Sequence, residues 1–151
     1  SGTEKMYRAL VLSNLLSVHQ KKYVGSLSAY CGVVSAACSA GAAIMYLHGG
    51  DYDAIARTIT NTLANVGGIV CDGAKSSCAS KIVSALTAAI LAYHMSLDNR
   101  VFQPGEGIVQ KDVEGTIRSM GCVGKVGMKQ TDIEILNIML NKTDLSSQPI
   151  C

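Results

Sequence analysis

The stretch Leu27–Gly50, LSAYCGVVSAACSAGAAIMYLHGG, decides the fold of this chain. It carries no charged residue between Ala29 and Leu47, and the segment His48-Gly49-Gly50 closes it as a helix stop. Its alanine, glycine and serine side chains are small, so neighbouring helices can approach it closely. The stretch therefore predicts a buried central helix over 27–47.

Helices are expected on both sides of this stretch, because apolar residues recur there at helical spacing. The expected helices run from Thr3 into Lys21, from Asp51 as N-cap to the residue before Gly67, over Ala79–Leu97, over about Val109–Met120, and from Asp132 to about Asn141. No run alternates apolar and polar residues as a strand would. We predict an all-α fold, one domain of about six helices over residues 1–141 around the Ala/Gly-rich helix, and a flexible tail over 142–151.

Two short motifs lie near the C-terminal end of the chain. Thr131 and Glu134 have the spacing of a capping box, in which the side chain of each residue accepts a hydrogen bond from the backbone amide of the other. The segment Gly121–Gly127 contains too many glycines for a helix and is expected to be a tight connection. It lacks the lysine followed by Ser or Thr of a phosphate-binding loop, so a nucleotide site is not expected.

Composition and charge exclude several classes of protein. The net charge is +2 at pH 7 and the basic residues are dispersed, which argues against a nucleic-acid partner. The uncharged run over 29–47 is long enough to span a membrane, but its Ala, Ser, Cys and Gly residues insert weakly, so no membrane partner is expected. The chain shows no signal peptide and lacks an initiating Met, and we expect a cytoplasmic protein of which this sequence is a part that starts mid-protein.

Six cysteines in a chain without a secretory signal are expected to be reduced thiols, metal ligands or packing residues. Cys71 and Cys78 are seven residues apart, and Gly73 between them allows a loop that returns both sulfurs to one point. Cys31, near the start of the central helix, is the third candidate ligand. A cluster held by three cysteines keeps one iron without a protein thiolate, and such an iron can act as a Lewis acid in an α,β-elimination. The alternative, that these cysteines only pack as small hydrophobic residues, stays open.

The other cysteines and the histidines have no partner at ligand spacing. Cys38 lies about 10 Å along the helix from Cys31, too far for a disulfide, and is expected to pack in the core. Cys122 is expected in a loop, and Cys151 as an exposed thiol of the tail. Three histidines are expected to be structural: His19, His48 and His94.

Asp72 and Lys75 lie between the two loop cysteines. One interpretation has them orient a cluster or substrate through hydrogen bonds to its ligands. In the other, Asp72 bonds the amides of the loop and Lys75 faces water. The sequence leaves both open.

A resemblance to a known family covers nearly the whole chain except the tail. The matching segments are Ala29–Gly32, Tyr46–Gly50, Gly68–Lys75, Cys78–Lys81, Ile108–Arg118, Gly127-Met128 and Thr131-Asp132. They resemble the L-serine dehydratase α-subunit/L-cysteine desulfidase family. Within it, the Cys71-Asp72-Gly73-Ala74-Lys75 loop is similar to the desulfidase branch, whereas bacterial serine dehydratases have Cys-Asp-Pro and a longer interval to the next cysteine.

The resemblance implies a 4Fe–4S cluster held by Cys31, Cys71 and Cys78, with the remaining iron binding a small amino-acid substrate and without pyridoxal phosphate. It implies an enzyme that converts L-cysteine to pyruvate, ammonia and hydrogen sulfide. L-serine as the substrate is the alternative, and a structural or regulatory helical module without a working cluster is another. The N-terminal portion of the family, which would supply the catalytic base, is missing here as a domain or subunit, so no turnover is expected from this chain alone. A homo-oligomer is left open.

Overall fold

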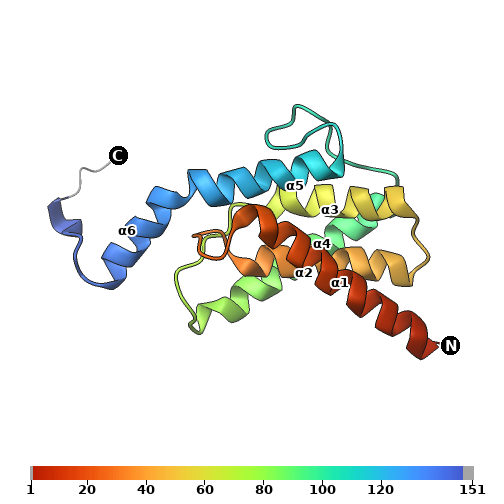
Figure 1. Ribbon diagram of the computed structural model, residues 1–151, viewed down its shortest axis with the longest axis horizontal. Helices are drawn as coiled ribbons and strands as arrows, with labels where there is room; N and C mark the ends of the chain where they lie inside the picture. The colour runs from red at the N-terminus through yellow and green to blue at the C-terminus, as the bar shows by residue number, and fades with distance from the viewer. Residues whose placement is uncertain (1, 148–151) are drawn as a thin grey trace.

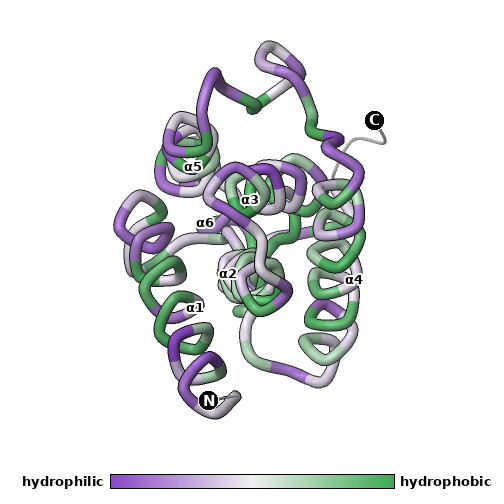
Figure 2. The backbone as a smooth tube through the Cα atoms, turned by 90° about the vertical axis from the view of Figure 1, so that its right-hand side faces the viewer, coloured by the Kyte–Doolittle hydropathy of each residue, from purple (hydrophilic) through white to green (hydrophobic). Residues whose placement is uncertain are grey.

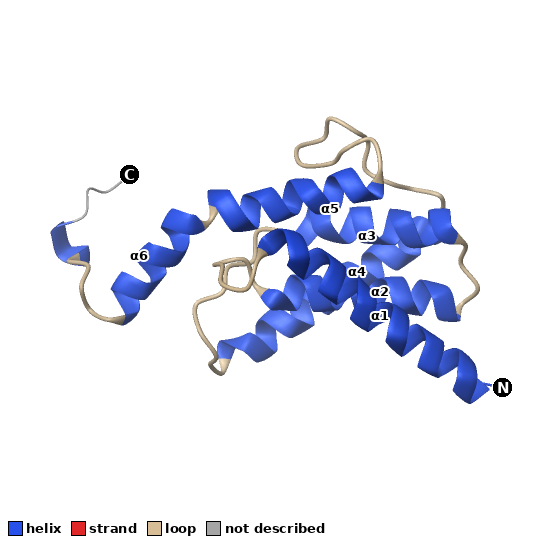
Figure 3. Ribbon diagram, in the orientation of Figure 1, coloured by secondary structure: helices blue, strands red, loops and turns tan. Residues whose placement is uncertain are grey.

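The computed structural model describes residues 2–147, and all regular structure in that part of the chain is helical (Figures 1 and 3). The elements are α1 (Gly2–Val24), α2 (Gly32–Leu47), α3 (Tyr52–Val66), α4 (Ser77–Leu97), α5 (Val113–Cys122), the π-helix η1 (Val123–Gly127), α6 (Lys129–Met139) and the short 3-10 helix η2 (Leu145–Ser147). The prediction of an all-α fold with six helices is confirmed. The predicted tail reaches beyond this part of the chain, and Cys151 lies outside the described residues.

Helix α2 lies in the middle of the bundle, in contact with α1, α3 and α4 (Figure 2). Val34, Cys38 and Ala42, spaced four residues apart on α2, are each 0% exposed. They belong to a core cluster with residues of α3 and α5, among them Leu63 and Ile117. A central position suits α2 because its residues are apolar or small on nearly every side.

The helices approach α2 closely, and some of the polar groups buried between them are paired. A Cβ added at Gly41 would lie 3.0 Å from the Cβ of Ala89 on α4. The Gln20 amide donates a hydrogen bond to the Ser39 hydroxyl at 3.0 Å. Such pairing limits the cost of placing polar side chains in an apolar interior.

Two helix starts carry a carboxylate cap. Asp51 accepts a hydrogen bond from the amide of Ala54 at 2.9 Å, which confirms its prediction as the N-cap of α3. Asp112 caps α5 in the same way through the amide of Gly115 at 2.6 Å. Because Asp112 is extended, α5 begins at Val113 and not near Val109 as predicted.

The central helix begins five residues later than predicted, at Gly32 instead of Leu27. Cys31 is extended, with φ −70° and ψ 125°, and is the N-cap of α2. The residue before it, Tyr30, forms an isolated antiparallel bridge with Val70. This long-range pairing takes the segment away from the helix that its composition favours.

The prediction of a tight connection over Gly121–Gly127 is wrong, because α5 continues through Cys122 and then passes into the π-helix η1. The glycines serve close packing instead. A Cβ at Gly121 would lie 2.3 Å from the Cβ of Tyr23 on α1, and one at Gly124 would lie 3.1 Å from the Cβ of Tyr30. Tertiary packing therefore outweighs the low helix propensity of glycine here.

The capping box is also wrong. Helix α6 begins at Lys129 after Met128, which makes no side-chain cap, so Thr131 and Glu134 lie inside the helix. Glu134 accepts a hydrogen bond from the amide group of Gln130 at 2.8 Å. No residue of α6 is buried, and in Figure 1 the helix extends away from the rest of the bundle.

One helix of the described residues, α4, is long and apolar enough to cross a membrane by length and composition. Buried helices of globular proteins meet the same criterion, but only 22% of this stretch of α4 is buried. The stretch considered from the sequence forms α2, which has 16 residues.

Candidate functional site

The antiparallel bridge between Tyr30 and Val70 brings two of the candidate cysteines together. The amide of Cys31 donates to the carbonyl of Ile69 at 3.0 Å, and the amide of Cys71 donates to the carbonyl of Ala29 at 2.6 Å. In this pattern residues 31 and 71 are diagonal neighbours on the same face of the bridge. The pairing thus joins the start of α2 to the segment after α3, which we call the cysteine loop (residues 69–78).

Cys78 lies in the first turn of α4, at the end of the cysteine loop. Its Sγ donates to the carbonyl oxygen of Gly73 at 3.4 Å, so the thiol turns back toward the loop. Gly73 has φ +93°, a conformation that glycine adopts at little cost. The loop therefore turns back at Gly73, while the prediction that it returns the sulfurs of Cys71 and Cys78 to one point stays a prediction.

Lys81 contacts the residues on both sides of Cys71. Its Nζ donates to the carbonyl oxygen of Val70 at 2.8 Å and pairs with the carboxylate of Asp72. Since Lys81 lies one turn after Cys78 on α4, it ties that helix to the segment that carries Cys71. Sequence reasoning missed this residue, although a lysine three residues after a candidate ligand at a helix start is a usable signal.

Asp72 is the acidic centre of the loop. Its carboxylate pairs with Lys75 and with Lys81, and these hydrogen bonds, that from Lys75 first, lower the pKa of Asp72 to about 2. Asp72 raises the pKa of Lys81 in turn, and the nearby Cys31 and Cys78 add to that effect. The two residues nominated from the sequence therefore pair with each other, while Lys81 adds a positive charge close to two of the thiols.

Two of the three candidate thiols lie at helix N-termini. Cys31 caps α2 and Cys78 lies in the first turn of α4, where the helix N-terminus carries positive partial charge. Cys31 is 5% exposed, whereas Cys71 and Cys78 are half-buried. Cys71 and Cys78 are therefore partly accessible to small molecules, whereas Cys31 is covered.

A cleft of about 380 Å³ lies beside Cys71, between the cysteine loop, the segment after α1 and α6. Its lining includes Tyr30, Cys71, Gly73, Asp132 and Met139. A space of that size holds a small amino acid.

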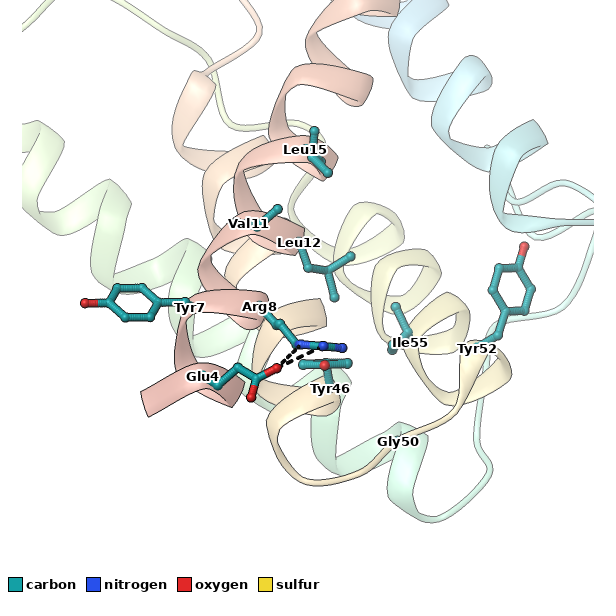
Figure 4. Close-up of a pocket in the computed structure, with 10 residues that line it drawn as sticks. All are labelled: Glu4, Tyr7, Arg8, Val11, Leu12, Leu15, Tyr46, Gly50, Tyr52 and Ile55. Atoms are coloured by element: carbon teal, nitrogen blue, oxygen red, sulfur yellow. Dashed lines mark hydrogen bonds and ion pairs between the residues drawn. The ribbon is translucent and has the colours of Figure 1, made fainter. Parts of the chain in front are cut away.

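A larger cleft, of about 720 Å³, lies at the opposite end of α2 and contains no cysteine (Figure 4). Tyr7, Val11 and Leu15 of α1 line it together with Tyr46 and Ile55. The charged groups at its edge, Arg8 and Glu4, pair with each other at 3.0 Å. This cleft has no contact with the cysteine loop and is apolar.

Among the described residues, no three His, Cys, Asp or Glu side chains are arranged to hold a single metal ion. The assignment of Cys31, Cys71 and Cys78 as ligands of a larger cluster stays a prediction. Cys38 lies in the core instead, and burial raises the pKa of its thiol to about 12. Cys122 is exposed at the end of α5, inside a helix rather than a loop.

Two of the three histidines have partners that are distant in the sequence. His19 pairs with the carboxylate of Glu114 at 2.8 Å, between α1 and α5. His48 lies 2.6 Å from the hydroxyl of Tyr93, between the end of α2 and α4. Both contacts join helices to each other and lie away from the cysteine loop.

Fold and site together define a helical domain that carries three of its thiols at one end of the bundle. The family model for the serine dehydratase alpha chain matches residues 1–137 of this chain. Because that match covers most of the chain, the chain belongs to the serine dehydratase alpha chain family. The resemblance recognised in the sequence is thereby confirmed.

The relatives of the chain are longer proteins. It is 59% identical to a UPF0597 protein of Desulfitobacterium hafniense (strain Y51), over 94% of this chain and 33% of that protein. It is 56% identical to a UPF0597 protein of Lachnoclostridium phytofermentans, over 91% of this chain and 33% of the relative. The chain thus spans about a third of the length of the curated relatives it matches. No solved structure matches it.

Proposed function

We propose that this chain is the cluster-binding domain of an amino-acid lyase that catalyses α,β-elimination, with a 4Fe–4S cluster held by Cys31, Cys71 and Cys78. The observation that carries the proposal is the bridge between Tyr30 and Val70, which brings Cys31 beside the cysteine loop in a chain of this family. With L-cysteine and one water as reactants, the products are pyruvate, ammonia and hydrogen sulfide.

The donor set fits an iron–sulfur cluster, whose irons prefer thiolate ligands. Three thiols without a disulfide lie around one loop, two of them at helix N-termini, and the ammonium of Lys81 lies nearby to offset their negative charge. When bound, the cluster supplies a Lewis acid through the iron that has no protein thiolate. The chain's own contribution is to hold the ligands through the bridge and Lys81, and to offer the cleft beside Cys71 to the substrate.

L-cysteine is preferred as the substrate because the Cys71-Asp72-Gly73-Ala74-Lys75 loop is similar to that of the desulfidases. A second candidate is L-serine, which the family's description as a serine dehydratase alpha chain favours. Both reactions remove a group from Cβ and a proton from Cα, without pyridoxal phosphate.

The catalytic base belongs to a part of the enzyme beyond this chain. The relatives are about three times as long as the segment they share with it, and the family is described as an alpha chain. We therefore propose residues 1–141 as one domain of a cytoplasmic enzyme that acts with a further domain or subunit. A helical module without a working cluster is the competing proposal.

The test is anaerobic reconstitution of this chain with iron and sulfide, followed by absorbance near about 400 nm and iron analysis. We expect the wild type to take up about four irons, and Cys31→Ala, Cys71→Ala and Cys78→Ala each to lose the cluster. Cys38→Ala is the matched control, because Cys38 lies in the core.

A wild type that stays colourless, or a Cys38→Ala variant that loses iron as the others do, would favour the helical module. Folding of each variant is checked by circular dichroism, so that loss of ligand is separated from loss of structure. Turnover assays with L-cysteine and L-serine need the complete enzyme and then decide between the two substrates.

A further inference from the structure

Helix α4 buries small residues and exposes large apolar ones, which is the reverse of an ordinary surface helix. Its buried residues are small: Ala85, Ala88, Ala89, Ala92 and Ser96. Its large apolar residues are exposed: Ile82 46%, Val83 64%, Leu86 37%, Ile90 48% and Leu91 51%. A helix that faces water normally buries its large apolar side chains and exposes polar ones. The outward face of α4 is therefore built for contact with another apolar surface.

This face continues into a groove over the central helix. Gly32, Ala36 and Ala40, four residues apart on α2, line the groove together with Ile82 and Leu86 of α4, and its volume is about 390 Å³. Helices α1 and α4 have no contact with each other and lie on opposite sides of α2 (Figure 2). Among the described residues no helix lies on this side of α2, and Ala36 in the middle of an otherwise central helix is exposed.

The shape and composition of the groove fit a helix. Gly and Ala at every fourth position leave a shallow surface on α2 into which the side chains of another helix pack. From Ile82 to Leu97, α4 carries no Asp, Glu, Lys or Arg, so nothing in the wall of the groove requires a polar partner. The groove also begins at Gly32 and Ile82, which directly follow Cys31 and Lys81.

We propose that this groove receives an apolar helix from the other two thirds of the family polypeptide, lying along α2 between α1 and α4. The argument for that occupant is length: relatives 59% and 56% identical to this chain match it over only 33% of their own residues. One end of the docked helix borders the cysteine loop, where it brings groups that this chain lacks. The statement that the docked helix brings groups to the cysteine loop rests on the proposed function, whereas the docking itself does not.

The experiment measures the accessibility of single cysteines in two proteins. Ala36→Cys and Leu86→Cys are each introduced into this chain. The same substitutions are introduced into a full-length chimera, in which this chain replaces the matching residues of the Desulfitobacterium hafniense relative. Lys111→Cys is the control, since the loop 98–112 lies beyond α3 and α5 from the groove (Figure 2). Labelling by a maleimide is followed at each cysteine by peptide mass spectrometry.

We expect labelling at positions 36 and 86 to be at least about tenfold slower in the full-length protein than in this chain, with position 111 unchanged. Equal labelling in both proteins overturns the proposal. If labelling of this chain is slow and becomes fast on dilution, the groove binds a second copy of the chain. If labelling becomes slow only after phosphatidylglycerol vesicles are added, the groove binds a membrane. Both results also overturn the proposal. Iron uptake by this chain is measured separately, so the two proposals fail independently.

Discussion

Cys38 and Cys71, which lies in the cysteine loop, show the same type of residue in two different environments. Cys38 is 0% exposed between α2 and α3, and its Sγ makes a weak polar contact, 3.8 Å from the carbonyl oxygen of Ile59. Cys71 lies at the end of the bundle, between the carbonyl and the carboxylate that Lys81 holds. The difference teaches that the environment of a cysteine depends on its neighbours in the fold and not on its spacing in the sequence.

The two regions are also held by different forces. In the centre, apolar side chains such as Val34 and Leu63 are removed from water, which is the dominant source of stability. In the cysteine loop, hydrogen bonds and partly exposed ion pairs hold the chain, and such pairs add little to the stability of a fold. We therefore expect the centre to determine stability and the loop to determine local geometry.

The largest expected contrast is in thiol reactivity. Burial raises the pKa of Cys38 to about 12, so that its thiolate fraction at about pH 8 is on the order of one in ten thousand. We expect iodoacetamide to alkylate Cys38 at least about a thousandfold more slowly than the exposed Cys122. Peptide mass spectrometry over a time course measures both rates.

The pH dependence of stability follows from the same pKa. Because the folded-state pKa of Cys38 lies above the ordinary value of 9.0, its contribution to stability is complete below pH 9.0 and is lost as the pH rises toward about 12.

The control for the alkylation experiment is the unfolded chain. In urea, iodoacetamide should alkylate Cys38 as fast as Cys122. A rate in the folded protein within about tenfold of that of Cys122 would show that the centre opens readily.

The sequence predicted the centre better than the contacts of the loop. Helix α2 could be predicted because its composition alone requires burial, and Asp51 because a cap acts on the next few residues. The helical path of Gly121–Gly127 could not, since Gly121 packs on Tyr23 and Gly124 on Tyr30, which are distant in the sequence. Spacing nominated the three cysteines, but the bridge at Tyr30 and the contacts of Lys81 depend on chain segments that meet only in the fold.

The next contrast is in global stability. Leu63 is 1% exposed in the core cluster, so Leu63→Ala removes apolar contacts and leaves a cavity. We expect the free energy of unfolding to fall by about 2–5 kcal/mol, measured by urea denaturation. Leu27→Ala is the matched control because Leu27 is 89% exposed, and it should change stability by less than about 0.5 kcal/mol. Equal effects of the two substitutions would mean that the centre is not the source of stability.

The smallest effect on stability, and the sharpest test of the comparison, is expected from Lys81→Met. The substitution keeps the apolar stem and removes the ammonium that holds the Val70 carbonyl and Asp72. We expect the thermal midpoint to change little, while hydrogen exchange at the amide of Cys71 becomes severalfold faster, because Lys81 no longer ties the residues on either side of Cys71 to α4.

Lys75→Met is the matched control for that substitution, since Lys75 pairs with Asp72 but does not contact the carbonyl of Val70. It should leave exchange at Cys71 nearly unchanged. If Lys81→Met instead lowers the thermal midpoint as much as Leu63→Ala, the cysteine loop is part of the stabilising core and the division between the two regions fails. If exchange at Cys71 does not change, the bridge alone positions that cysteine, and Lys81 serves only as a charge near the thiols.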